Sequence, residues 1–108
     1  MPVKRSVKEI LIETELVSRV RAKGGLAEKV TVIGARGFFD RLVVLPGGRV
    51  FFVEVKRPHG GVYSPHQILR RRRYAELGAA VVMIEKSEDI DALMATAGAT
   101  LDQHSGRS

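Results

Sequence analysis

Two strand-like runs joined by a tight turn constrain this chain more than any other feature of the sequence. The runs cover residues 40–45 and 49–56, and the segment between them, Pro46-Gly47-Gly48, has the composition of a hairpin loop. Both runs are largely apolar on both faces, whereas a strand with one face in water alternates apolar and polar residues. The runs therefore predict two central strands of a sheet that is covered on both sides.

Helix start and stop signals flank this hairpin. Ser6 and Glu9 form a capping box, in which each side chain accepts a hydrogen bond from a backbone N–H, and a pair of glycines ends that helix at residue 24. A second helix opens with Ser64, a proline and a capping-box glutamine, Gln67, and runs to about residue 77. A third helix begins at a capping serine, Ser87, and runs to residue 98.

Short β-branched runs over residues 29–33 and 80–84 predict two further strands. The predicted order is helix, three strands, helix, strand and a C-terminal helix. The strand, helix, strand unit from residue 50 to 84 needs a crossover connection, so its two strands are parallel, while the hairpin strands are antiparallel. The sequence therefore predicts an α/β fold with a mixed β-sheet flanked by helices.

The composition is that of one globular domain. The 108 residues are 44% hydrophobic, which is enough for one core, so we expect a single domain with its core at about 6–98 and a loose tail at 99–108. Cysteine is absent and the three histidines lack the paired spacing of a zinc motif, which argues against zinc. No segment has the apolar pattern of a signal peptide or a membrane span, so the expected location is the cytoplasm.

Positive charge dominates the chain. Its 18 Lys and Arg against 12 Asp and Glu give a net charge of +6 and a pI near 10.2, a balance that favours polyanionic partners such as nucleic acid. Four consecutive arginines, Arg70, Arg71, Arg72 and Arg73, cover every side of the second predicted helix, so some must face solvent. They form either a clamp for phosphates or a solvated helix face.

Two carboxylates and a lysine converge at the open end of the hairpin. Glu54 and Lys56 are two residues apart on one strand and therefore share a face. With a three-residue loop, Leu45 pairs with Arg49, and counting back along the ladder sets Asp40 opposite Glu54. Opposed like charges repel, so a positive group is expected between these two acids.

A divalent cation is the group that suits this arrangement. Carboxylates, a nearby carbonyl such as that of Val55, and water form an all-oxygen site of the kind that Mg²⁺ or Mn²⁺ prefers. Such an ion can bind a phosphate oxygen and make a bound water more acidic. Lys56 would orient or stabilise the attacking hydroxide, because two adjacent carboxylates favour its charged form. Taken singly, Glu54 and Lys56 fit a solvated ion pair at a strand end, and Asp40 fits an ordinary turn aspartate. Their joint placement across the hairpin favours the metal site.

Four separated motifs occur in a fixed order along the chain. They are Glu13, Arg36-Gly37-x-x-Asp40, Glu54-Val55-Lys56 and Ser64-Pro65-His66-Gln67. Together they resemble the VRR-NUC (virus-type replication-repair nuclease) family of the PD-(D/E)xK nuclease superfamily. The similarity runs from about residue 9 to residue 93, and the superfamily core of helix, three strands, helix and strand is the order predicted above.

The resemblance implies roles for six residues. It makes Asp40 and Glu54 metal ligands, with the Val55 carbonyl between them, and it makes Lys56 the catalytic lysine. It matches Glu13 to the first-helix acid of the family, which adds Glu13 to the candidate ligands. Gln67 matches the second-helix glutamine.

One departure from the family pattern stands next to the site. The family usually has valine and proline before the aspartate, whereas this chain has Phe38-Phe39. Proline restricts the backbone, so its absence bears on the shape of this loop more than on the ligands. Phe38, Phe39 and Tyr63 either pack onto their own sheet or lie in loops that a partner covers.

Several roles stay open at the level of sequence. Glu13 lies on the inward stripe of the first helix, where either the metal site or a buried arginine would satisfy it. Gln67 is either catalytic or only the capping-box residue of its helix. Lys29 either faces the site or is a solvated strand lysine, and Arg36 is a further candidate contact for nucleic acid.

The expected function is that of a Mg²⁺- or Mn²⁺-dependent endonuclease that hydrolyses DNA phosphodiesters. The resemblance implies a homodimer that acts on branched DNA such as four-way junctions. A competing interpretation is a non-catalytic nucleic-acid-binding module, in which the basic helix binds and the acids are structural. A basic interaction subunit of a repair complex is a third, which explains the charge but not the acids.

Overall fold

The computed structural model describes residues 6–34, 39–55 and 65–105, with residues 97–105 as backbone only. Its elements follow the predicted order and give the predicted α/β fold with a mixed sheet. They are α1 (Val7–Ala22), β1 (Leu26–Glu28), β2 (Arg41–Leu45), β3 (Arg49–Val55), α2 (Pro65–Glu76), β4 (Val81–Ile84) and α3 (Ser87–Ser105). Within these ranges, none of the helices is both long and apolar enough to cross a membrane.

The sheet has the strand order β1-β2-β3-β4, with antiparallel pairs except for the parallel pair β3 and β4. The predicted hairpin register is confirmed, because Leu45 pairs with Arg49 across a three-residue turn. Gly47 and Gly48 in this turn have φ values of 92° and 76°, which residues with a side chain rarely adopt. The turn chemistry thus sets the register, and the register decides which side chains share a face.

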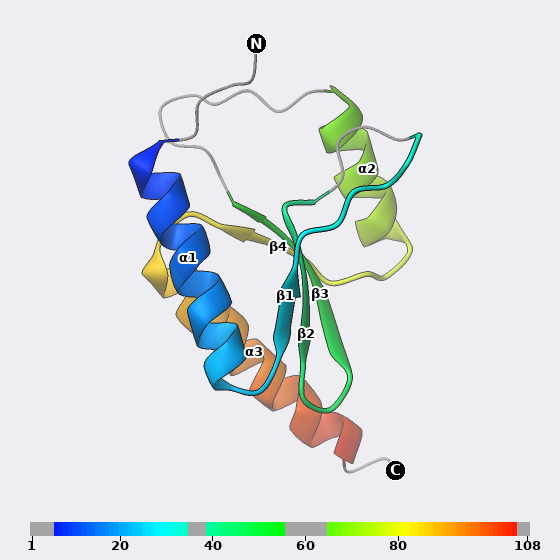
Figure 1. The fold of residues 1–108 in the computed structure, drawn as a ribbon. Coiled ribbons are helices and arrows are strands. Elements are labelled where there is room, and N and C mark those ends of the chain that lie inside the picture. The colour runs from blue at the N-terminus through cyan, green and yellow to red at the C-terminus, as the bar shows by residue number, and fades with distance from the viewer. Residues whose placement is uncertain (1–5, 35–38, 56–64, 106–108) are drawn as a thin grey trace.

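Helices cover both faces of the sheet (Figure 1). α1 and α3 pack on one face, where Leu16 and Val20 of α1 and Ile90 of α3 are fully buried. Strand residues that point to this face complete the core, among them Ala27, Val43, Phe51, Val53 and Ile84. α2 lies on the opposite face, beside the end of the sheet at which β3 finishes.

Aromatic contacts attach α2 to its face of the sheet. The rings of Phe39, Phe52 and Tyr74 form a cluster, with centroids 4.9 to 5.3 Å apart. Phe39 is only 4% exposed, so it packs onto its own sheet, whereas Phe38 and Tyr63 lie outside the described residues. Such tilted and edge-on ring pairs stabilise by about 0.5 to 1.5 kcal/mol each beyond the area they bury.

The first helix begins as predicted. The Ser6 hydroxyl accepts from the Glu9 backbone N–H at 3.0 Å and the Glu9 carboxylate faces the Ser6 backbone N–H, which confirms the capping box. After α1, Gly25 lets the chain turn into β1 directly against β2. A Cβ on Gly25 would lie 2.5 Å from the Val44 carbonyl oxygen, so no other residue fits without a shift.

The predicted strand over 29–33 is wrong. The strand at this position is Leu26–Glu28, and its last pair joins Glu28 to Leu42 of β2. β2 begins at Arg41, so the β-branched run after Glu28 extends past the end of its partner strand. A strand needs a hydrogen-bonded neighbour, and β-propensity does not replace one.

Two details of the last helix also differ from prediction. α3 continues to Ser105 instead of ending at Gly98, because one glycine lowers helix propensity without removing a backbone hydrogen bond. Ser87 is the first helical residue and its hydroxyl donates to Glu15 Oε1 at 2.6 Å. The carboxylate of Asp89 caps this end instead, since Oδ2 accepts from the backbone N–H groups of Glu85 and Lys86 at 2.8 and 3.1 Å.

Arg19 joins the two helices of the core face. Its guanidinium contacts Glu15 at 3.3 Å within α1 and Asp91 of α3 at 2.7 Å. The hydrogen bond to Asp91 raises the pKa of Arg19, which is protonated at neutral pH in either case. The contact therefore contributes to helix pairing and carries no pH dependence near neutrality.

Candidate active site

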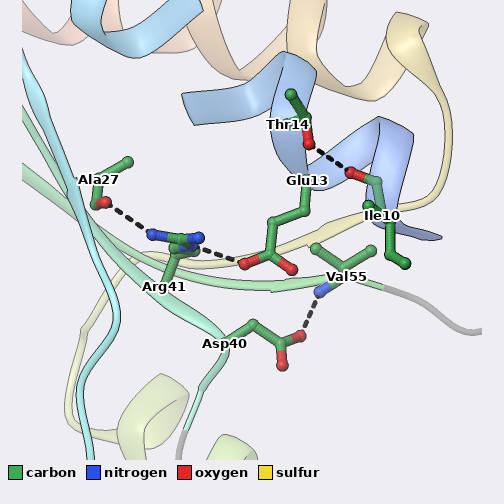
Figure 2. A network of polar contacts seen from close by, with 7 residues as sticks. All are labelled: Ile10, Glu13, Thr14, Ala27, Asp40, Arg41 and Val55. Atoms are coloured by element: carbon green, nitrogen blue, oxygen red, sulfur yellow. Dashed lines mark hydrogen bonds and ion pairs between the residues drawn. The ribbon is translucent and has the colours of Figure 1, made fainter. Parts of the chain in front are cut away.

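Asp40 closes the open end of the hairpin with its side chain. Its Oδ2 accepts a hydrogen bond from the backbone N–H of Val55 at 2.7 Å (Figure 2). In a longer ladder, a backbone carbonyl of the neighbouring strand would take that N–H. β2 starts at Arg41, and extending the register by one residue sets Asp40 opposite Glu54, as the sequence predicts.

Glu54 lies at the end of β3, on the face that α2 covers. Alternation along β3 puts Val53 and Val55 in the core and Glu54 on the other face with Phe52. The residue is 2% exposed, and its Oε2 lies 3.3 Å from Nε of Arg71 in α2. A carboxylate this deeply buried is stable only with a counter-charge or strong donors, and Arg71 supplies the counter-charge.

Glu13 has a different partner on the other face. Its Oε2 accepts a hydrogen bond from Nε of Arg41 at 2.6 Å, and Nη1 of Arg41 donates to the Ala27 carbonyl at 3.0 Å (Figure 2). The side chains of Glu13 and Arg41 are 5% and 18% exposed. The buried arginine pair is one of the two arrangements that the sequence leaves open for Glu13, and the structure contains it. This pair ties α1 to β1 and β2 beside Asp40.

The three acids thus split between two faces. Glu13 lies on the α1 face with Arg41, and Glu54 points to the α2 face. Asp40 directly precedes Arg41, so by alternation it lies on the face opposite to Arg41, which is the face of Glu54. Figure 2 shows the carboxylates of Glu13 and Asp40 on either side of the β3 backbone at Val55. In the part of the chain that the structure describes, no three side chains of His, Cys, Asp or Glu are grouped so that they could hold a metal ion.

Asp40 and Glu54 fit a hard divalent cation in donor chemistry. Each carboxylate has two oxygens with two lone pairs each, so the contacts with Val55 and Arg71 leave acceptor capacity. Mg²⁺ commonly takes one or two protein carboxylates and completes its shell with water or substrate phosphate. Two carboxylates at the end of one hairpin meet that requirement without Glu13.

Comparison with known proteins decides the family. A scan against protein-family models finds no match. A protein of Acyrthosiphon pisum secondary endosymbiont phage 1, described as "Putative nuclease p44", is 41% identical over 90 residues, which are 83% of this chain and 95% of that protein. A solved structure described as "VRR_NUC domain" is 34% identical, with a TM-score of 0.74 over 82% of this chain and 96% of that one. The chain belongs to the VRR-NUC family.

The second helix of this VRR-NUC chain presents two different faces. Gln67, Arg70, Arg71 and Tyr74 are half-buried, at the spacing of one inward stripe, whereas Arg72 and Arg73 are exposed. The arginine run is therefore divided, with Arg71 against Glu54 and two arginines facing solvent. Lys29 is exposed and lies after the end of β1. Lys56, Arg36 and the capping Ser64 lie outside the described residues.

Sequence reasoning missed the two arginines that neutralise the acids. The sequence predicts no role for Arg41, and it predicts only phosphate binding for Arg71, as one of four arginines. A signal for each exists in hindsight. Arg41 is an inward position on a strand, opposite Val53, and Arg71 shares the i, i+3 stripe with the aromatic Tyr74. A charged residue on an apolar stripe indicates a buried counter-charge elsewhere in the fold.

Proposed function

We propose that this VRR-NUC chain is a divalent-metal-dependent endonuclease that hydrolyses DNA phosphodiester bonds. The observation that carries the proposal is the placement of Asp40 and Glu54 opposite each other at the open end of the hairpin, in a member of a nuclease family. Two acids opposed in this way repel each other unless a positive group lies near them, and a divalent ion is such a group. Lys56, the lysine of the motif, follows directly after the same end of β3 in the sequence.

Asp40 and Glu54, with the backbone carbonyl of Val55, would hold Mg²⁺ or Mn²⁺ in this enzyme. When bound, the ion supplies Lewis acidity toward a phosphate oxygen and lowers the pKa of a water molecule. Lys56 contributes positive charge that orients and stabilises the attacking hydroxide. The position of Gln67 on the inward stripe of α2, two helical turns from Tyr74, supports its inclusion in the proposed site.

The DNA backbone would lie along the solvent side of α2. Arg72 and Arg73 are exposed there, and Arg70 is half-buried beside them. Lys29 and Arg36 add positive charge from the segment before β2, and the chain as a whole carries +6. Phosphate contacts of this kind fix the position of the duplex without reading its sequence, which suits an enzyme selective for structure.

Branched DNA such as a four-way junction is the proposed substrate, cut by a homodimer. Resolution of a junction needs two opposed cuts, and a two-fold dimer presents two copies of one site. The non-catalytic alternative keeps the same basic helix but gives Asp40 and Glu54 no chemical role. The two proposals differ in metal dependence, because only the enzyme needs a divalent ion for turnover.

A panel of labelled single-stranded, duplex, flap and junction DNAs, incubated with Mg²⁺ or Mn²⁺, tests the proposal. We expect cleavage that requires the ion, stops with chelator, and is fastest on branched substrates. A Glu54→Gln variant is the matched control, since it keeps the shape of the side chain while removing the charged ligand. DNA binding without cleavage under every metal condition would support the binding module and reject the enzyme.

A further inference from the structure

The ion pair between Glu54 and Arg71 has a consequence that rests on the proposed function and concerns its regulation. Nε of Arg71 and Oε2 of Glu54 lie 3.3 Å apart, as an ion pair and not an aligned hydrogen bond. The carboxylate end is 2% exposed, whereas the arginine side chain is 25% exposed. One partner is therefore fixed in the sheet, and the other extends to the surface.

The fold places Arg71 over this acid. Glu54 pairs with Met83 of β4 in the parallel register, and Nη1 of Arg71 contacts Sδ of Met83 at 3.4 Å. A thioether is a weak acceptor, so the carboxylate is the stronger of these two partners. Tyr74, one turn further along α2, packs on Phe52 of the same strand and keeps this side of the helix against the sheet.

A guanidinium and a divalent cation that bind the same carboxylate weaken each other's binding. Both are attracted to Glu54, and each repels the other through a medium of low effective dielectric. Burial of Glu54 requires a counter-charge when no ion is present, and it does not require Arg71 once a divalent ion is bound. We propose that Arg71 occupies Glu54 in the metal-free protein and competes with the divalent ion for this carboxylate.

The competition makes Arg71 a positioning residue with two states. In the first it holds Glu54 and stabilises the fold without metal. In the second its guanidinium is released toward the surface that Arg72 and Arg73 already line, where it adds positive charge. Metal binding and release of Arg71 are then linked, so removal of the arginine must tighten metal binding.

Calorimetric titration with Mn²⁺, without DNA, tests this inference on the whole chain. We expect Arg71→Met to bind Mn²⁺ on the order of tenfold more tightly than the wild type, the size of a typical coupling between two sites. Arg71→Lys keeps the positive charge and should stay near wild-type affinity. Arg72→Met removes the same charge from the same helix without touching Glu54, and should leave Mn²⁺ affinity nearly unchanged.

Thermal unfolding without metal is the second measurement. Without metal, Arg71→Met should unfold at a lower temperature than Arg72→Met. When Mn²⁺ is then added, the unfolding midpoint of Arg71→Met should rise more than the midpoint of the wild type. If Arg71→Met does not fold, Arg71→Gln replaces it, because its amide can still donate to Glu54 without a charge. If folded Arg71→Met, or Arg71→Gln in its place, binds Mn²⁺ no more tightly than the wild type, the proposed competition is wrong. A wild type that neither binds Mn²⁺ nor cuts DNA overturns the proposed function itself.

Discussion

Asp40 combines a structural role and a proposed chemical role in one carboxylate. Its Oδ2 takes the backbone N–H of Val55 at 2.7 Å, which ends the ladder between β2 and β3. The same side chain is a proposed metal ligand. Truncation to alanine removes both roles at once. It leaves the backbone N–H of Val55 without this acceptor, and a buried donor without a partner costs about 1 to 3 kcal/mol. Asparagine separates them, since its amide oxygen can still accept from Val55.

We predict that Asp40→Asn lowers the cleavage rate by on the order of 100-fold or more, because the ligand loses its charge where charge is stabilised in the reaction. Its free energy of unfolding should change by only about 1 kcal/mol. Single-turnover cleavage and urea denaturation measure the two effects. Glu88→Gln removes an acid from the exposed start of α3 and serves as the control. Wild-type cleavage by Asp40→Asn would reject Asp40 as a ligand.

At the scale of the elements, one arginine holds three of them together. Arg41 of β2 reaches Glu13 of α1 at 2.6 Å and the Ala27 carbonyl of β1 at 3.0 Å. The packing of α1 against the first two strands therefore includes a buried polar contact as well as apolar side chains. Through Arg41, Glu13 also fixes the strand that starts directly after Asp40.

Arg41→Met should lower the free energy of unfolding by about 3 to 5 kcal/mol, because it leaves Glu13 buried without its counter-charge. Urea denaturation measures the loss. Arg21→Met, at an exposed position of α1, removes an equal charge and should cost much less. The double variant Glu13→Leu with Arg41→Met should recover much of the loss, and failure to recover would assign the cost to Ala27 and packing.

The division of α2 into two faces predicts which arginines bind DNA. Each phosphate contact that is lost should flatten the slope of log binding constant against log salt concentration by about 0.9 on duplex DNA. Arg72→Gln with Arg73→Gln should therefore reduce the slope, measured by fluorescence anisotropy. Arg21→Gln with Lys23→Gln changes two exposed charges near the end of α1 and is the matched control. If both double variants change the salt slope equally, the DNA does not bind preferentially along the exposed face of α2.

At the scale of the whole molecule, the sheet carries an apolar row that the described residues cover only in part. Leu26, Val44 and Val50 are opposed across β1, β2 and β3, and Leu26 and Val50 are 56% and 43% exposed. Figure 1 shows α2 beside the other end of the sheet, so this row lies near the hairpin turn. The row is a candidate contact for a second copy of the chain, whereas Phe39 is buried within its own fold.

Light scattering should report twice the 11.9 kDa chain mass at micromolar concentration, and cleaved junctions should carry paired, symmetric nicks. Val50→Lys puts a charge in the apolar row and should shift the mass toward one chain. Val7→Lys, at a position 73% exposed on α1, is the control for added charge. A monomeric wild type that makes only single nicks would reject the junction resolvase and leave the metal site unaffected.

The sequence alone determined the features that short-range rules govern. The capping box at Ser6, the Pro46-Gly47-Gly48 turn and the alternation of side chains along the hairpin depend on neighbours within a few residues. They were enough to give the element order, the hairpin register and the juxtaposition of Asp40 with Glu54. The sequence motifs also identified the family, which the comparisons confirm.

Only the tertiary structure decided which partner each charged group meets. Glu13 and Arg41 are 28 residues apart in the sequence. Arg71 contacts Glu54 from α2, which a long connection separates from β3 in the sequence. Such pairs depend on how helices are placed over the sheet, which packing of the aromatic and aliphatic side chains sets. The β-branched run after Glu28 failed as a strand for the same reason, because a strand exists only where a neighbour remains to bond it.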